Sequence, residues 1–425
     1  MSEQTKFSPY YSILQEELIL AQGCTEPIAI AYASATAAKV LAHRPERLIV
    51  ACSGNIFKNV QSVIIPGTGT LTGVAAAAVL GAVAGNADLT LEVLRDVTQR
   101  DVQETTELLA KQYCKTELID DIDVPLVIRI TAQYGEECAE VTVMHTHTNI
   151  VQIKKNGKIL KTEEEQKQEK SAARDELAIR GILEFAETVS LEAVRPLLQR
   201  QIENNLRIAE EGLHHKYGAN VGQMMLASAR PEDARTIAIA YAAAGSDARM
   251  AGCELPVVIN SGSGNQGITV SLPVVMLARA WGKTEEELLR ALVVSNLTAV
   301  RIKHNMGSLS AFCGAVSAAC GAGAGLAYLK GFDEAGVGAT ITNMLANISG
   351  LVCDGAKASC AAKIASAVSA SFLALDLAEQ GFSFAAGDGF VGRDVEETID
   401  NISTIVKNGM RSMDKEILKV MLQCG

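Results

Sequence analysis

The sequence predicts an α+β protein in which helices predominate and a smaller α/β insert interrupts the helical part. Apolar residues make up 48% of the 425-residue chain but aromatic residues only 4%, so Ala, Val, Ile and Leu supply most apolar side chains, alongside 35 Gly. Small side chains of this kind let helices approach one another closely. With 20% charged residues, the composition is typical of a globular chain rather than a disordered one.

Residues 10–40 predict two helical stretches on either side of an interruption at residues 22–27, Gln-Gly-Cys-Thr-Glu-Pro. Because Pro27 suits the first turn of a helix, Cys24 is expected at or just before a helix N-terminus. The elements expected next are a short buried strand at 48–52 ending in Ser-Gly-Asn, an apolar run at 63–65, a Pro-Gly turn and an Ala-rich helix at 71–84.

From about residue 88 the pattern changes to that of a small α/β insert. Asn156-Gly157 is a strong hairpin signal between two alternating runs. The expected elements of the insert are a helix near 90–111 and strands at 124–131, 139–148 and within 151–160. A charge-dense connection at 161–176 then leads to a mostly helical region with one strand at 256–260. We therefore divide the chain into an N-terminal part of the main domain (1–88), an α/β insert (89–165) and a helical part of the main domain (166–425).

Charge and cysteine content exclude several functional classes. The formal net charge is 38 − 49 = −11 without a basic cluster, which argues against nucleic-acid binding. The first twenty residues do not resemble a secretion signal, and the most apolar stretches do not suit a bilayer, so we expect a cytoplasmic protein without a membrane partner. Ten Cys without a C-x-x-C pair favour metal binding or catalysis over a disulfide framework or a zinc ribbon. The expected partner is a small molecule, and the small-residue helices are compatible with a homodimer.

Two loops rich in Gly, Ser and Asn follow predicted strands, at residues 53–55 and 261–267. The second matches the G-x-G-x-x-G fingerprint of dinucleotide-binding folds. We reject that fold because residues 268–273, which include Pro273, are a poor helix start. Loops of this composition can instead bind a small anion such as a carboxylate through backbone N–H groups and short polar side chains. Two tight turns with internally satisfied side chains are the alternative.

Four cysteines in the C-terminal half form two pairs with the spacing C-x6-C. Seven residues along one straight helix place two side chains on one face but ~10.5 Å apart along the axis, too far for neighbouring ligands of one compact cluster. Asp354-Gly355 predicts a turn, so Cys353 can fold back from a loop toward Cys360 at a helix start. With a third thiolate from the region of Cys313 or Cys320, these residues could hold an iron–sulfur cluster. Buried free thiols in an Ala/Gly core are the alternative.

His145-Thr146-His147 falls in an alternating stretch, so both imidazoles are expected on one side of a strand. No third ligand is nearby in the sequence. We interpret them as ordinary strand histidines rather than a metal pair.

Five separated motifs carry a family resemblance that covers nearly the whole chain. They are GCTEP at residues 23–27, SGNIFKNVQSVIIPGTG at 53–69, SGSGNQG at 261–267, GSLSAFCG at 307–314 and CDGAKASC at 353–360. Together they resemble the L-cysteine desulfidase family, which belongs with the iron–sulfur serine dehydratases of alpha-chain-like fold.

The resemblance implies a [4Fe–4S] cluster held by three thiolates, with one iron left open for substrate. The ligand spacing of the family falls on Cys313, Cys353 and Cys360, which leaves Cys320 as a packed helix thiol. Cys24 occupies the place of the catalytic His of serine dehydratases, so the resemblance makes it the general base or a thiolate near the open iron. Residues 166–425 become the cluster-binding part of a catalytic domain with a serine dehydratase alpha-like fold.

The implied reaction is the conversion of L-cysteine and water to pyruvate, ammonia and hydrogen sulfide. A Lewis-acidic iron can stabilise the departing sulfur, and a base is needed at Cα, a role that suits Cys24 because a helix N-terminus favours its thiolate. The residues expected to bind the substrate carboxylate and ammonium are Ser53, Asn55, Lys58, Asn59, Ser261, Ser263, Asn265, Gln266 and Lys303.

Three readings remain open at this stage. The same cluster could serve an L-serine or D-serine dehydratase, or a non-catalytic redox or amino-acid sensor. The third alternative is a cluster-free binding protein that uses the two loops alone. Some serine dehydratases place a C-terminal Cys on the open iron, a role that would fall to Cys424 here, with a disordered tail thiol as the alternative.

Overall fold

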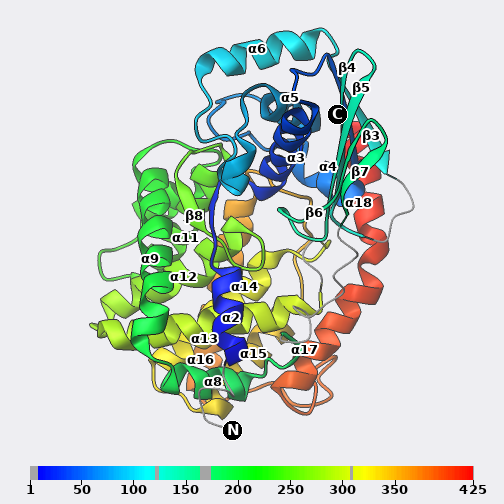
Figure 1. Cartoon of the computed structure of the whole chain (residues 1–425). Helices are drawn as coiled ribbons and strands as arrows, with labels where there is room; N and C mark the ends of the chain where they lie inside the picture. The colour runs from blue at the N-terminus through cyan, green and yellow to red at the C-terminus, as the bar shows by residue number, and fades with distance from the viewer. Residues whose placement is uncertain (1–7, 120–123, 163–173, 307–309, 425) are drawn as a thin grey trace.

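The structure is a computed structural model that describes residues 8–119, 124–162, 174–306 and 310–424. Figure 1 shows a smaller, sheet-containing part packed on a larger helical part. The predicted class, a predominantly helical α+β fold, is confirmed. Most of the charge-dense stretch at 161–176 and the first three residues of the motif at 307–314 lie outside the described residues.

The smaller part is built on a six-stranded sheet of order β3-β2-β4-β5-β6-β7. β2 is parallel to β3 and antiparallel to β4, and the remaining neighbours are antiparallel. The strands are β2 (Arg47–Ser53), β3 (Cys114–Ile119), β4 (Val127–Tyr134), β5 (Glu137–Met144), β6 (Ile150–Lys155) and β7 (Lys158–Thr162). β2 comes from residues 1–88 and the other five strands from 89–165, so these two segments share one sheet.

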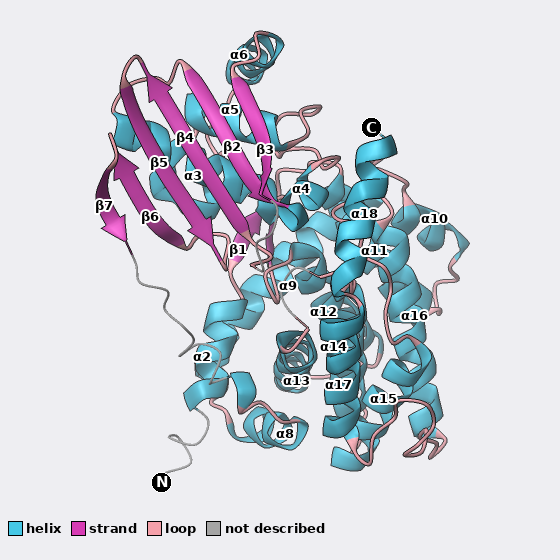
Figure 2. Ribbon diagram, turned by 90° about the vertical axis from the view of Figure 1, so that its right-hand side faces the viewer, coloured by secondary structure: helices cyan, strands magenta, loops and turns pink. Residues whose placement is uncertain are grey.

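Helices α3 (Thr25–Leu41) and α5 (Val74–Ala84) pack on one face of this sheet (Figure 2). The predicted hairpin is confirmed, since Asn156 and Gly157 both adopt the positive φ that its tight turn requires. The helix expected near 90–111 is instead a 3₁₀ turn, η1 (Ala87–Glu92), and a separate helix, α6 (Gln99–Ala110). α6 begins at 99 because Thr98 and Asp101 form a capping box.

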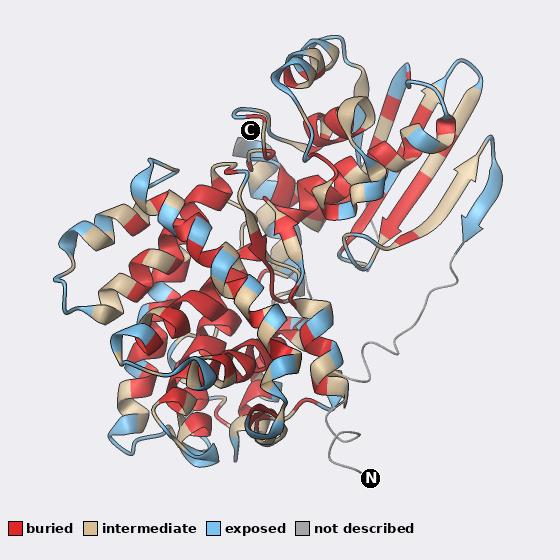
Figure 3. Cartoon of the chain, turned by 60° about the vertical axis from the view of Figure 1, so that its left-hand side comes forward, coloured by how far each residue is buried: buried red, intermediate tan, exposed pale blue. Residues whose placement is uncertain are grey.

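The larger part is a stack of helices around α14 (Gly314–Leu329), which is buried almost throughout (Figure 3). Its glycines allow close approach, because a Cβ on Gly321 would lie 2.5 Å from the Ser295 carbonyl oxygen of α13. The surrounding helices are α8 (Ile179–Thr188), α9 (Leu191–His214), α10 (Val221–Ser228), α11 (Ala234–Met250), α12 (Gly264–Ala280), α13 (Glu285–His304), α15 (Glu334–Asn347), α16 (Cys360–Glu379) and α17 (Val395–Thr404).

α16 is the one helix among the described residues that is long and apolar enough to span a bilayer. It packs against α11, α14 and α15, so the helical part itself accounts for this apolar composition. After α17 the chain forms a short π-helical turn, η2 (Ile405–Gly409), and then α18 (Arg411–Cys424). α18 packs on α4 (Gly54–Val60), which follows β2 in the smaller part.

A two-stranded antiparallel sheet links the segments that lead toward the centre of the molecule. β1 (Leu20–Gln22), which follows α2 (Ser8–Glu17), pairs with β8 (Pro256–Val258). The prediction that no helix follows β8 was wrong, because α12 begins at Gly264 and continues through Pro273. Packing of α12 against α11 and α14 outweighs the local cost of an internal proline. A dinucleotide fold is still excluded, since β8 belongs to this antiparallel pair and not to a parallel sheet.

Candidate active site

Four helices begin at one cavity between the two parts of the molecule. Cys24 is the N-cap residue of α3, as predicted, Ser263 that of α12 and Cys313 that of α14, while Cys360 is the first residue of α16. The cavity has a volume of about 100 Å³, room for a small molecule of a few heavy atoms. Because helix N-termini carry partial positive charge, their convergence favours anionic groups such as thiolates and carboxylates.

One wall of the cavity, the thiol wall, contains the three cysteines assigned as cluster ligands, Cys313, Cys353 and Cys360. Two loops bring the first two together, since the Cys313 N–H donates to the Leu351 carbonyl at 2.8 Å and the Cys353 N–H to the Ala311 carbonyl at 2.7 Å. A hydrogen bond from the Cys313 thiol, with the nearby charge of lysine side chains, lowers the pKa of Cys353 to about 6. The same hydrogen bond and burial raise the pKa of Cys313.

Three thiols are a donor set that iron–sulfur clusters accept from proteins. No group of three His, Cys, Asp or Glu side chains in the described part of the chain is close enough to hold one ion. A cluster binds each thiolate through a different iron, so its ligands need not converge on a single point. Cys320 lies elsewhere, buried within α14 with its sulfur 3.9 Å from the Ile341 carbonyl oxygen.

A second part of the cavity lining, the proton wall, is organised around the buried carboxylate of Glu26 in the first turn of α3. Glu26 accepts hydrogen bonds from the Cys24 thiol at 3.0 Å, the Thr25 hydroxyl at 3.2 Å and the Asn59 amide at 2.9 Å. Burial and the charge of Glu26 raise the pKa of Cys24 well above its ordinary value. The expectation that the helix N-terminus favours a Cys24 thiolate was therefore wrong for this state, because burial and the carboxylate outweigh the helix dipole.

His147 also belongs to the proton wall, although the sequence analysis dismissed it. β5 ends at Met144 and His145 has a φ of +68°, so the two histidines lie in a turn and the strand prediction for them was wrong. Burial lowers the pKa of His147, although the charge of Glu26 opposes this shift. Its Nε2 atom is buried without a hydrogen-bond partner among the described residues. Burial acts to raise the pKa of Glu26, but His147, Cys24 and Arg249 together lower it.

The structure brings seven of the nine predicted substrate-binding residues to the cavity. The residues that line it are Lys58, Asn59, Ser261, Ser263, Asn265, Gln266 and Lys303. Ser53 and Asn55 are not among the lining residues. The Ser53 hydroxyl donates to the Pro125 carbonyl at 2.7 Å and accepts from the Val127 N–H at 3.2 Å, so it fastens β2 to the segment before β4.

The two lysines expected to bind a carboxylate have other partners. Lys58 is buried, forms a 2.6 Å ion pair with Asp414 of α18 and donates to the Cys353 carbonyl at 3.2 Å. Lys303 donates to the Ser310 hydroxyl at 3.1 Å, and burial lowers its pKa to about 8. Arg249, at the end of α11, is a third cation at the cavity that the sequence analysis missed. The sequence did contain a signal for Arg249, because a charged residue near the end of an Ala-rich, buried helix is unusual.

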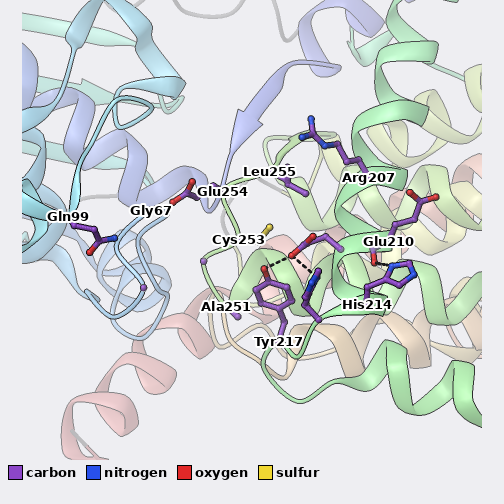
Figure 4. A pocket seen from close by; sticks show the side chains of 14 residues that line it. Gly67, Gln99, Arg207, Glu210, His214, Tyr217, Ala251, Cys253, Glu254 and Leu255 are labelled. Carbon is purple, nitrogen blue, oxygen red and sulfur yellow. Dashed lines mark hydrogen bonds and ion pairs between the residues drawn. The ribbon is translucent and has the colours of Figure 1, made fainter.

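A second, more open groove of about 780 Å³ lies between α9, the loop after α11 and the turn at Gly67–Gly69 (Figure 4). Its side chains include Arg207, Glu211 and Tyr217, and the Tyr217 hydroxyl donates to Glu211 at 2.9 Å. None of the predicted site residues lines this groove.

Comparison with known proteins agrees with this geometry. The model of the serine dehydratase alpha chain family matches residues 88–419, a range that includes the whole thiol wall. The chain belongs to the serine dehydratase alpha chain family. A UPF0597 protein of Lachnoclostridium phytofermentans is 49% identical over 96% of this chain and 98% of its own length. Others from Desulfitobacterium hafniense and Treponema denticola are 46% and 44% identical, each over 99% of this chain and over 98% and 99% of their own lengths.

The resemblance that the five sequence motifs carry is thus confirmed as far as the serine dehydratase alpha chain family. Residues 1–87, which contribute Cys24, Glu26, Lys58 and Asn59, lie outside the range matched by the family model. The three relatives nevertheless align across at least 96% of the chain.

Proposed function

We propose that this protein is a cytoplasmic iron–sulfur lyase that converts L-cysteine and water to pyruvate, ammonia and hydrogen sulfide. The observation that carries the proposal is the meeting of Cys313, Cys353 and Cys360 with Cys24 in one small cavity. Family membership supports an eliminating lyase. Association as a homodimer remains a prediction.

The [4Fe–4S] cluster would be held by Cys313, Cys353 and Cys360. When bound, it would supply a Lewis acid that stabilises the leaving sulfide. The lowered pKa of Cys353 favours the thiolate that a ligand requires. Four helix N-termini and the buried ammonium of Lys303 would offset the negative charge of three thiolates.

On the proton wall, Cys24 would remove the α-proton. Because its pKa is raised, the thiol must first release a proton, and the Glu26 carboxylate oxygen that accepts its hydrogen bond at 3.0 Å can take it. His147, whose pKa is lowered by burial, offers a second acceptor beside Glu26. Loss of the α-proton and of sulfide leaves aminoacrylate, which tautomerises and hydrolyses in water to pyruvate and ammonia.

The description of the matched family favours L-serine as the second candidate substrate. The same cavity would then release water in place of hydrogen sulfide.

Protein purified and assayed without oxygen should release equal amounts of pyruvate and sulfide from L-cysteine, and lose this activity in air. Pyruvate from L-serine alone would move the assignment to dehydration. No product from either amino acid, with intact cluster absorbance, would exclude the lyase and favour a sensor.

A further inference from the structure

Arg249 is a buried cation without a carboxylate partner at the centre of the proposed active site. Its side chain is 3% exposed and lines the cavity. Among the described residues it makes one hydrogen bond, from Nη1 to the Asn265 Oδ1 atom at 3.2 Å, and its Nε atom has no partner. Desolvating an arginine is costly, so a buried guanidinium with free N–H groups points to an anion that completes the site.

The position of the guanidinium is fixed by the first two residues of α12. A Cβ on Gly264 would lie 2.3 Å from Nε and 2.8 Å from Cζ of Arg249, so only glycine leaves room for the side chain. Asn265 then orients one end of the guanidinium. The remaining N–H groups form a planar fork, the geometry that binds a carboxylate with two parallel hydrogen bonds.

Arg249 helps to lower the pKa of Glu26, but no carboxylate among the described residues lies within ion-pair distance of it. The two oxygens of Glu26 already accept from Cys24, Thr25 and Asn59, and no ion pair joins Glu26 to Arg249 among the described residues. Lys58 is neutralised by Asp414, and Lys303 faces the thiol wall beside Ser310. Arg249 is thus the cation left for an incoming anion.

A second unpartnered atom completes the match to an α-amino acid. Asn59 Oδ1 is buried in the same cavity without a partner, and as a neutral acceptor it suits an ammonium group. We propose that Arg249, positioned by Gly264 and Asn265, binds the α-carboxylate of the substrate, so that the site selects free α-amino acids. This inference rests on the proposed function for its substrate class, but its test does not require turnover.

The test measures binding of L-alanine, which has no leaving group, to the cluster-loaded full-length protein by calorimetry. Arg249→Gln should weaken L-alanine binding by about a hundredfold, the scale of a lost charge-assisted pair. The L-alanine affinity of Arg249→Lys should lie between those of wild type and Arg249→Gln, because lysine keeps the charge but lacks the two parallel N–H groups of the guanidinium. Ethylamine, which lacks the carboxylate, should bind wild type and Arg249→Gln equally.

Arg207→Gln makes the same substitution in the second groove and should bind L-alanine like wild type. Asn265→Ala should weaken L-alanine binding several-fold while keeping the cation. Equal L-alanine affinity in wild type and Arg249→Gln would overturn the proposal, as would parallel losses for L-alanine and ethylamine. A protein that binds L-alanine through Arg249 but releases no pyruvate would refute the lyase and leave this inference standing.

Discussion

The two walls of the cavity differ in chemistry and in origin. The thiol wall comes from the helical part and presents three sulfurs, two at the N-termini of α14 and α16 and one from the loop before α16. The proton wall comes largely from the sheet-containing part and presents a carboxyl group and an imidazole with lowered pKa values and a thiol with a raised pKa. The difference suggests a division of labour in which one wall holds a cofactor and the other moves a proton. Substitutions on each wall should therefore give different kinds of loss.

The largest effect is expected on the thiol wall. Cys353→Ser should abolish both cluster absorbance and lyase activity, because a ligand thiolate is lost. Cys320→Ala is the matched control, since that thiol is packed inside α14 away from the cavity, and it should retain both. Anaerobic absorbance spectra and iron content provide the measurement. A Cys353→Ser protein with a full complement of iron would remove this residue from the ligand set.

On the proton wall, Cys24→Ala should leave the cluster intact but reduce kcat by about 10²–10⁴-fold, the usual contribution of a general base. Absorbance should match wild type because Cys24 is not assigned as a ligand. His147→Gln tests whether the imidazole of His147, rather than the Cys24 thiolate, removes the α-proton. Full activity of Cys24→Ala with loss in His147→Gln would transfer the base role to the imidazole.

The two Ser-Gly-Asn segments provide a smaller contrast. Both open a helix, but Asn265 lines the cavity whereas Asn55 does not. Asn265→Ala should raise KM for L-cysteine about tenfold through a loosened Arg249, with kcat nearly unchanged. Asn55→Ala should leave KM unchanged. Equal effects of the two substitutions would show that the cavity extends further toward α4 than its lining residues indicate.

The smallest expected effect concerns Asp247, a buried carboxyl group that is not part of the proton wall. Asp247, two residues before Arg249, has a pKa raised by burial to about 6, and its Oδ1 atom has no partner among the described residues. Because this pKa is raised, the folded state gains stability from protonated Asp247 at low pH and loses it as pH rises through 6. Asp247→Asn should therefore stabilise the protein more at pH 7.5 than at pH 5, by about 1 kcal/mol. Chemical denaturation at the two pH values measures this difference.

The parts of the fold that follow local rules could be predicted from the sequence. Pro27 indicated the helix that Cys24 caps, and Asn156-Gly157 indicated the hairpin. α12 was missed because local rules penalise Pro273, whereas packing in a buried bundle decides its conformation. β2 sits between β3 and β4, a long-range pairing that no local pattern reveals.

The site was predictable where residue type limits the chemistry. Spacing allowed Cys353 and Cys360 to share a cluster with Cys313 or Cys320, and the family resemblance selected Cys313; all three chosen residues line the cavity. The Gly-rich loop at 261–267 was expected to bind an anion, and five of its residues line the same cavity. Glu26, His147 and Arg249 were missed because each is an ordinary charged or titratable residue whose role depends on burial beside the others. The lysines were chosen as substrate cations by their place in the sequence, which does not show that Asp414 already neutralises Lys58.

The ion pair between Lys58 and Asp414 makes the last helix of the chain part of the active-site architecture. Shortening the protein before α18 would leave a buried ammonium next to the Cys353 carbonyl without its counter-ion, and an unpaired buried charge destabilises its surroundings by roughly 3–5 kcal/mol. The loop that contains Cys353, a proposed cluster ligand, would be destabilised. Removal of α18 by truncation or proteolysis is thus expected to weaken the hold on the proposed cluster, although Asp414 lies far along the chain from Cys353.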